Sequence, residues 1–185
     1  MDKSALRKLK MKERDSLNPN EVQALSDIIL NRIISLKEYK DADTLLTFVS
    51  CRSEVVTDGL ILSALKYGKK VGVPKVEGDI MNFYNIKGLD ELETGYFGIR
   101  EPKQGLPLLD PKGSLMIVPG LAFDLCLNRI GYGKGFYDRY FAAHKDAAYI
   151  KCGIAFELQM CEKIEADRFD QPLDMLVTET RIIRS

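Results

Sequence analysis

The chain has 185 residues, of which 45% are hydrophobic and 29% charged, a composition typical of a globular protein with one well-formed core. Lys plus Arg equal Asp plus Glu at 27 each, so no overall basic field argues for a nucleic-acid partner. No stretch is apolar for long enough to span a membrane, and the first residues lack a signal-peptide core, so we expect a cytoplasmic protein.

Cysteine and histidine usage argues against three further classes of protein. The four cysteines show no C-x-x-C pair and no metal-type spacing, which favours reduced thiols over a disulfide framework. The only histidine, His144, lies in a polar stretch, so a histidine-ligated zinc site or a serine-histidine hydrolase is not expected.

Apolar periodicity predicts alternating helices and strands in a single domain over residues 1–185. In chain order, we expect helices over 3–17 and 20–37, a strand over 44–49, a helix over 57–67, strands over 71–74, 80–86 and 115–118, a helix over 135–142, strands over 150–155 and 175–178, and a last edge strand over 180–184. Residues 87–113, rich in Gly and Pro, are expected to form a long functional loop with short turns.

Local signals set several of these boundaries. Asn18 or Asn20 can cap the second helix, Thr57 is the expected N-cap of the third, and Gly68 is expected to close it. Strands separated by helices predict an α/β fold with a mainly parallel sheet and helices on both faces. Ligands of such sheets bind beyond the carboxyl ends of the strands. In this chain the loops after Val49 and Val118 emerge there.

The run VPGLAFDLCLNRIGYGKGFYDRY, from Val118 to Tyr140, carries the clearest chemical signal. A loop with Arg129, three alternating glycines and Lys134 joins an apolar strand to a helix, and glycine lets backbone N–H groups converge on a phosphate. Asp138, one turn into the helix, could hold a divalent ion against the phosphates. The segment matches neither G-x-G-x-x-G nor G-x-x-x-x-G-K-[ST], so a turn kept for packing alone is the alternative.

The segment GYGKGFYDRY, preceded by VPGLAFD and NR, resembles the signature of the 5-formyltetrahydrofolate cyclo-ligase family, also called 5,10-methenyltetrahydrofolate synthetases. The resemblance continues in order along the chain, with a K-x-x-L-R opening at residues 3–7, E-V-x-T at 54–57, G-I-x-E-P at 98–102, and Leu173-Asp174 before a short apolar strand. Each match alone is weak, but the ordered set covers residues 3 to about 178.

The resemblance implies a Rossmann-like three-layer α/β/α sandwich and an ATP- and Mg²⁺-dependent ligase that converts 5-formyltetrahydrofolate to 5,10-methenyltetrahydrofolate, releasing ADP and phosphate. Transfer of the γ-phosphoryl group to the formyl oxygen would give an imino-phosphate, from which N10 attack expels phosphate. The protein would mainly position the reactants and neutralise charge. We expect small-molecule substrates, neither nucleic acid nor membrane as partner, and a monomer.

The resemblance also implies residue roles. Arg129 and Lys134 would act on the transferred group, and the ATP site would comprise Lys3, Arg7, Arg129, Gly131, Tyr132, Gly133, Lys134, Gly135, Phe136 and Tyr137. The folate site would comprise Val49, Glu54 and the same loop from Tyr132 to Phe136, with Met81, Phe83 and Tyr96 as candidates for the pterin wall. Asp138 and Asp174 would bind Mg²⁺.

Each role has a structural alternative. Lys3 and Arg7 could form a solvated helix face, Asp174 could be a turn residue, and Met81 and Phe83 could be core residues. The segment Leu125–Asn128 replaces a more polar turn with an extra glycine in many members, which indicates either packing against an apolar neighbour or an altered approach to the site. Lys134 stands where some members have glycine, so the loop backbone is the firmer phosphate contact.

Two further functions keep the fold. A non-catalytic folate- or nucleotide-binding relative would be expected to lack Asp138 or Arg129, and this chain has both. A sugar-phosphate isomerase or acyl-CoA transferase would rest on fold analogy alone.

Overall fold

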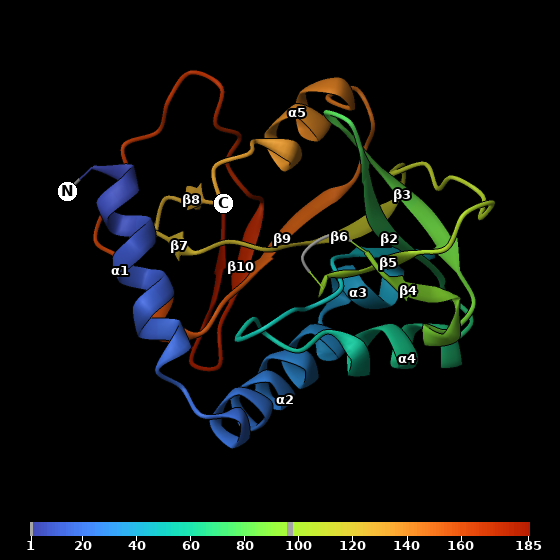
Figure 1. Cartoon of the computed structure of the whole chain (residues 1–185), viewed down its shortest axis with the longest axis horizontal. Helices are drawn as coiled ribbons and strands as arrows, with labels where there is room; N and C mark the ends of the chain where they lie inside the picture. Colours follow the sequence, from blue (N-terminus) through green and yellow to red (C-terminus); the bar gives the residue numbers. More distant parts are fainter. Residues whose placement is uncertain (1, 96–97) are drawn as a thin grey trace.

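The computed structural model describes residues 2–95 and 98–185 as a central sheet between two layers of helices (Figure 1). The helices are α1 (Lys3–Asp15), α2 (Pro19–Ser35), α3 (Lys37–Asp41), α4 (Asp58–Lys66) and α5 (Phe136–Ala143), with 3-10 turns η1 (Leu89–Glu91) and η3 (Glu157–Gln159). The strands are β1 (Thr44–Thr47), β2 (Lys70–Glu77), β3 (Ile80–Ile86), β4 (Leu92–Thr94), β5 (Arg100–Pro102), β6 (Ser114–Val118), β7 (Ala122–Phe123), β8 (Arg129–Ile130), β9 (Ile150–Ile154), β10 (Met175–Val177) and β11 (Ile182–Arg184).

The main sheet has seven strands in the order β11-β10-β9-β6-β1-β2-β3. β10, β9, β6, β1 and β2 run parallel, while β11 and β3 pair antiparallel at the two edges. The predicted α/β fold with a mainly parallel sheet is therefore confirmed. The chain leaves β1 towards β2 on one side and later returns to β6 on the other, so the strand order reverses between β1 and β6. Ligands of open α/β sheets bind at such a switch point.

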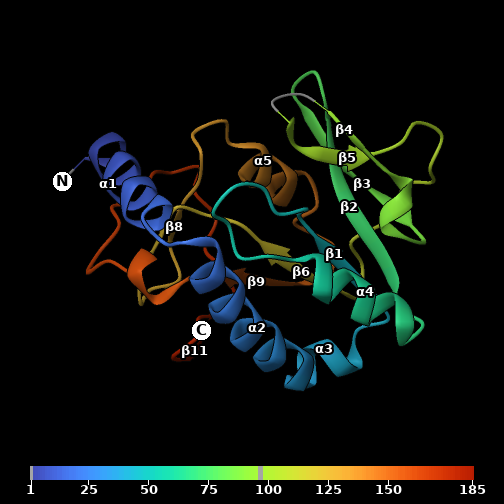
Figure 2. The ribbon, with the colours of Figure 1, turned by 60° about the horizontal axis from the view of Figure 1, so that its bottom comes forward.

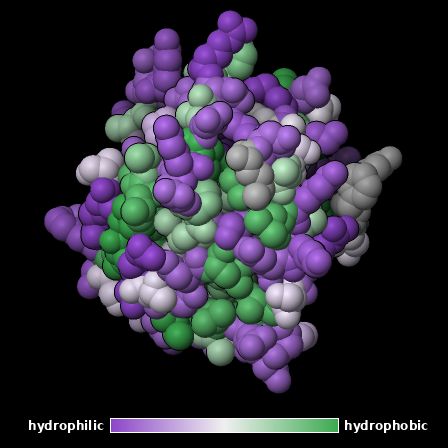
Figure 3. Space-filling view, turned by 90° about the vertical axis from the view of Figure 1, so that its left-hand side faces the viewer, coloured by the Kyte–Doolittle hydropathy of each residue, from purple (hydrophilic) through white to green (hydrophobic). Residues whose placement is uncertain are grey.

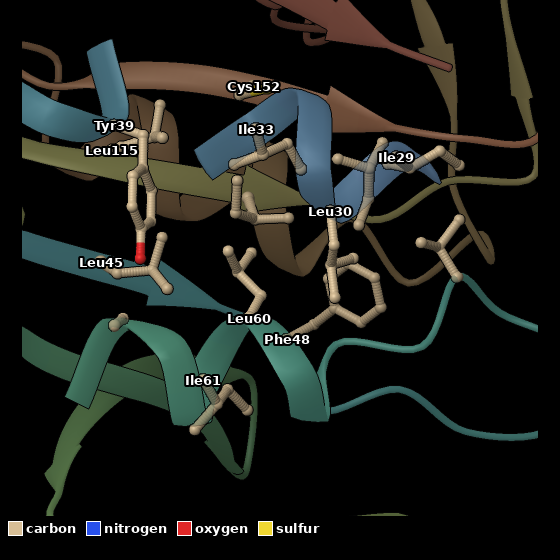
Figure 4. Close-up of a cluster of buried hydrophobic side chains, with 14 of the residues drawn as sticks. Ile29, Leu30, Ile33, Tyr39, Leu45, Phe48, Leu60, Ile61, Leu115 and Cys152 are labelled. Carbon is tan, nitrogen blue, oxygen red and sulfur yellow. The ribbon is translucent and has the colours of Figure 1, made fainter. Parts of the chain in front are cut away.

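Side chains alternate between the two faces along each strand, and helices cover both faces. Leu45, Leu115 and Ile117 pack with α2, α3 and α4, whereas Met116 and Val118 pack with α5. Figure 2 shows α2, α3 and α4 on one side of the sheet and α5 on the other. In Figure 4, side chains from α2 and α4 converge on those of β1 and β6, which form the larger cluster of the core.

The predicted helix signals are partly confirmed. Asn18 caps α2 with a capping box, in which its side chain accepts the Glu21 amide and the Glu21 carboxylate accepts the Asn18 amide. Gly68 follows α4 with a φ of +76°, as a closing glycine should. Thr57 holds the N-cap position of α4, but its hydroxyl bonds the Phe48 carbonyl and the Ser50 amide instead of the helix. Its side chain therefore fixes the loop after β1.

Two expectations need correction. Residues 87–113 are not merely a loop with turns, because β4 and β5 pair antiparallel within them and Lys75 of β2 donates to the Pro102 carbonyl. Arg129 is not a loop residue, because it lies on β8, which pairs antiparallel with β7. Strands of two or three residues carry too little periodicity to be recognised in the sequence. Within the described ranges, no helix is both long and apolar enough to cross a bilayer.

Candidate active site

The glycine-rich loop links β8 to α5 on the side of the sheet that α5 covers (Figure 1). Gly133 and Gly135 have φ angles of +94° and +67°, which other residues rarely adopt. Gly135 forms the N-cap of α5 without a side-chain hydrogen bond, and Lys134 is exposed. The loop therefore presents backbone and one free lysine side chain at a helix N-terminus, an arrangement suited to anions.

Arg129 lies buried beneath this loop. Its Nη2 donates to Asp138 Oδ1 at 2.9 Å, and its guanidinium lies 5.7 Å from the ring centroid of Tyr137 and 5.6 Å from that of Phe141. Among the described residues, only three buried polar side-chain atoms have no hydrogen-bond partner, and Arg129 Nε and the Tyr137 hydroxyl are two of them. Burial raises the pKa of Tyr137, so its hydroxyl remains protonated and able to donate.

The first helix reaches the loop through the two basic residues that the sequence singled out. Arg7 Nε donates to the Gly131 carbonyl at 3.0 Å. Lys3 Nζ contacts Asp167 at 2.6 Å and Asp170 at 2.5 Å. Burial alone would lower the pKa of Lys3, but its hydrogen bonds to the two carboxylates outweigh burial and raise it. The structure thus brings Arg7 to the glycine loop and Lys3 to an acidic segment near it.

Glu54 lies in the loop after β1, with 6% of its surface exposed. Its Oε2 accepts the Cys51 amide at 2.9 Å, and its Oε1 accepts the Tyr132 hydroxyl at 2.5 Å. Arg14, also buried, places its guanidinium 5.8 Å from the Tyr132 ring centroid. The loops after β1 and before α5, separated by 78 positions in the sequence, thus meet at Glu54 and Tyr132.

The candidate pterin wall is largely core. Met81 and Phe83 are buried in the cluster under α5, so their structural alternative holds. Val49 is buried in the larger cluster, which leaves its backbone for contact with a ligand. Tyr96 lies outside the described residues. Phe136, at the start of α5, is half-buried against the smaller cluster.

The two candidate metal ligands sit in different surroundings. Asp138 Oδ1 accepts from Arg129 and from the Gln171 amide, the latter at 3.3 Å. Asp174 precedes β10 at the amino end of the parallel strands, and its Oδ2 accepts the Lys151 amide at 2.7 Å. Across residues 2–95 and 98–185, no three His, Cys, Asp or Glu side chains gather into a metal-binding group. The donor set around the glycine loop fits an ion held by one carboxylate and by phosphate oxygens.

The segment Leu125–Asn128, which differs from the family pattern, packs against apolar neighbours. This is the first of the two interpretations offered by the sequence. Leu127 has a φ of +64° and is buried beside Phe123 and Leu173. Asp124 supports this turn, since its Oδ1 accepts the amides of Cys126 and Asn128. A buried leucine therefore occupies the left-handed position that a glycine would fill without strain.

Three residues of the site were missed in the sequence. Arg14, Asp167 and Asp170 carry no motif, and each is close to the site only through contacts across 39 or more positions. The basic density of the first helix was the one available signal for Arg14.

Figure 3 views the side of the molecule that carries α1, where hydrophilic side chains cover most of the surface and hydrophobic ones form small groups between them.

Comparison with known proteins gives one family. The model of the "5-formyltetrahydrofolate cyclo-ligase family" matches residues 1–179. A probable 5-formyltetrahydrofolate cyclo-ligase of Schizosaccharomyces pombe is 31% identical, over 100% of this chain and 98% of that protein. The Escherichia coli K12 5-formyltetrahydrofolate cyclo-ligase is 29% identical, over 91% and 96%.

A solved structure shares the fold. The NMR structure of Aquifex aeolicus 5,10-methenyltetrahydrofolate synthetase superposes with a TM-score of 0.87 at 36% identity, covering 100% of this chain and 93% of that one. Similarity of sequence and of fold thus extends along almost the whole chain, glycine loop included. The chain belongs to the 5-formyltetrahydrofolate cyclo-ligase family and is a ligase of folate metabolism.

Proposed function

We propose that the chain converts 5-formyltetrahydrofolate to 5,10-methenyltetrahydrofolate with MgATP, releasing ADP and phosphate. The observation that supports ATP binding is a pair of buried donors without hydrogen-bond partners under the glycine loop. They are Arg129 Nε and the Tyr137 hydroxyl. Buried polar groups nearly always have a partner, so two adjacent donors without one support an acceptor-rich ligand such as a triphosphate.

The triphosphate is cradled by the backbone of Gly131–Gly135 and by the charges of Lys134 and Arg129, with Lys3 and Arg7 approaching from α1. Tyr132, Phe136 and Tyr137 complete the nucleotide contacts. Arg129 and Lys134 neutralise the γ-phosphoryl group as it passes to the formyl oxygen, after which N10 closes the ring and phosphate leaves. Mg²⁺ would be held by Asp138 and phosphate oxygens, with Asp174 as the second candidate carboxylate, and would supply further charge neutralisation on the phosphates.

The folate is recognised on the other side of the loop. Glu54 accepts hydrogen bonds from pterin nitrogens, since a carboxylate offers acceptors only, and the backbone of Val49 lies nearby. The residues from Tyr132 to Phe136 contact folate as well as nucleotide.

We further propose that residues 1–185 act as a single-domain monomer in the cytoplasm.

Purified protein incubated with 5-formyltetrahydrofolate and MgATP should produce the methenyl chromophore and one ADP per turnover. Glu54→Gln should impair folate binding, because an amide replaces one acceptor by a donor, while ATP binding measured without folate stays near wild type. The matched control is Glu77→Gln, which alters another glutamate that accepts a tyrosine hydroxyl, that of Tyr84, on the β2–β3 hairpin.

Binding of both ligands without chromophore or ADP would favour the non-catalytic relative. Equal loss of folate and ATP binding in Glu54→Gln would instead assign Glu54 to the nucleotide or to the fold.

A further inference from the structure

Each carboxylate oxygen of Glu54 already accepts one hydrogen bond in this structure. The Cys51 amide occupies Oε2 at 2.9 Å, and the Tyr132 hydroxyl occupies Oε1 at 2.5 Å. The first donor belongs to the same tight turn and is fixed by it, since the Glu54 amide also donates to the Cys51 carbonyl. Only the second donor can leave without unfolding the turn. Glu54 is only 6% exposed, so a pterin donor that approaches Oε1 meets the Tyr132 hydroxyl and has to move it aside.

Tyr132 is placed so that it can leave. Its flanking residues are Gly131 and Gly133, and the latter has a φ of +94°. The residue remains 48% exposed although its hydroxyl reaches a carboxylate that is almost completely buried. Solvent therefore borders about half of the residue and leaves the ring room to rotate away from Glu54, and the two glycines allow the backbone to follow it.

Arg14 remains behind when the tyrosine leaves. Its guanidinium is buried near the Tyr132 ring, and its Nε donates to Ser53 Oγ at 3.1 Å. Ser53 precedes Glu54 in the chain, so the positive charge of Arg14 stays next to the turn that holds the carboxylate. The carboxylate can thus exchange one neutral donor for another without becoming a buried charge that lacks any compensating neighbour.

We propose that Tyr132 is a placeholder on Glu54: in the free protein its hydroxyl takes the position of a pterin N–H donor, and folate binding displaces it. The inference rests on the proposed folate site. Because Tyr132 lies inside the loop proposed to cradle the triphosphate, its release changes that loop when folate arrives. Arg7, which holds the Gly131 carbonyl, is the contact through which α1 would register the change.

The test is Tyr132→Phe, which removes only the hydroxyl. The Kd for 5-formyltetrahydrofolate without nucleotide, measured by calorimetry, should fall about tenfold, because binding no longer breaks a hydrogen bond to a charged group. The matched control is Tyr84→Phe, which removes the tyrosine–glutamate hydrogen bond to Glu77 at 2.6 Å and should leave the Kd unchanged.

A second measurement follows the ring in the wild-type protein. After incorporation of 3-fluorotyrosine, the ¹⁹F resonance that is missing in Tyr132→Phe should shift when folate is added. A higher Kd in Tyr132→Phe would overturn the proposal, because the hydroxyl would then be part of the bound site. An unchanged Kd, or a resonance that does not move, would also overturn it. Failure of the proposed function is separate: the wild type itself would neither bind 5-formyltetrahydrofolate nor form the chromophore.

Discussion

Two ion pairs flank the ring of Phe141, and they differ in almost every physical respect. Arg129 and Asp138 lie 2.9 Å apart with side chains 4% and 22% exposed, whereas Lys151 and Asp174 lie 4.0 Å apart with side chains 18% and 44% exposed. The two cations lie 5.6 and 5.5 Å from the ring centroid. The family resemblance led us to expect that both acidic residues, Asp138 and Asp174, bind Mg²⁺.

The difference separates what an acidic residue does for the fold from what it does for a ligand. The buried pair sits beneath the glycine loop with an unpaired nitrogen beside it, and removal of one partner leaves an uncompensated charge. The other pair is partly hydrated, and Asp174 also accepts a backbone amide, which is the behaviour of a turn residue.

The largest expected effect is on stability. Arg129→Ala should lower the free energy of unfolding by about 3 to 5 kcal/mol, because Asp138 then stays partly buried without its cation. For a chain of this length, that corresponds to a fall in Tm of roughly 10 °C by calorimetry. The burial of Arg129 makes this change more costly to the fold than the same change at an exposed loop position. The control, Lys151→Ala, should cost about 1 kcal/mol or less. Equal losses in the two variants would contradict the comparison.

The second effect concerns turnover and the metal. Asp138→Asn should lower turnover at least about tenfold at low Mg²⁺, with partial recovery at high Mg²⁺, because an amide oxygen coordinates but brings no charge. Asp174→Asn should do the same if both residues hold the ion. Titration of nucleotide binding with Mg²⁺ in both variants and wild type measures this. An unaltered Mg²⁺ dependence in Asp174→Asn would leave Asp138 as the only carboxylate ligand.

A third effect concerns α1. Lys3→Ala combined with Arg7→Ala should raise the ATP concentration needed for half-maximal turnover by about tenfold, the equivalent of one charge-assisted hydrogen bond. Lys8→Ala with Lys12→Ala removes the same charge from exposed positions of the same helix and serves as the control. If both double variants raised the required ATP concentration equally, α1 would act only through its net charge and not through contacts of Lys3 and Arg7.

The smallest effect is a pH dependence of less than about 1 kcal/mol. Burial alone would raise the pKa of Asp170, but hydrogen bonds from Lys3 and from the Asp167 amide lower it below 3.8. A lowered pKa stabilises the fold above the unfolded value and loses that effect as pH falls through the folded one. The raised pKa of Lys3 keeps the lysine charged throughout this pH range.

Asp170→Asn should therefore be less stable than wild type at pH 7, and the difference should be smaller at about pH 3, where the carboxyl begins to be protonated. Chemical denaturation at the two pH values gives the difference directly. A gap of the same size at both values would mean that Asp170 acts through its shape and not through its charge.

Much of the fold was predictable because its long elements are locally encoded. The capping box at Asn18 and the apolar stripe behind it define α2, and the apolar runs define β1 and β6. The glycine loop was identified for the same reason, since its residues are contiguous. The short strand β8 was not identified, and Arg129 was consequently expected to lie in the loop.

The rest of the site depends on contacts that no local pattern carries. The partners of Lys3 lie at the far end of the chain, and the partner of Glu54 is 78 positions away. A sequence can propose that Glu54 accepts hydrogen bonds, but only the fold reveals which donor holds it in the free protein.

The contact between Lys3 and Asp170 has a consequence for synthesis. The two residues are 167 positions apart, and ribosomes add about 5–20 residues per second, so roughly 8 to 33 seconds separate their appearance. For most of that interval the basic helix α1 has neither the glycine loop nor its acidic partners to dock on. The nascent chain therefore exposes a positively charged amphipathic segment until the glycine loop and Asp170 have emerged, so α1 can complete its contacts with the site only after that point.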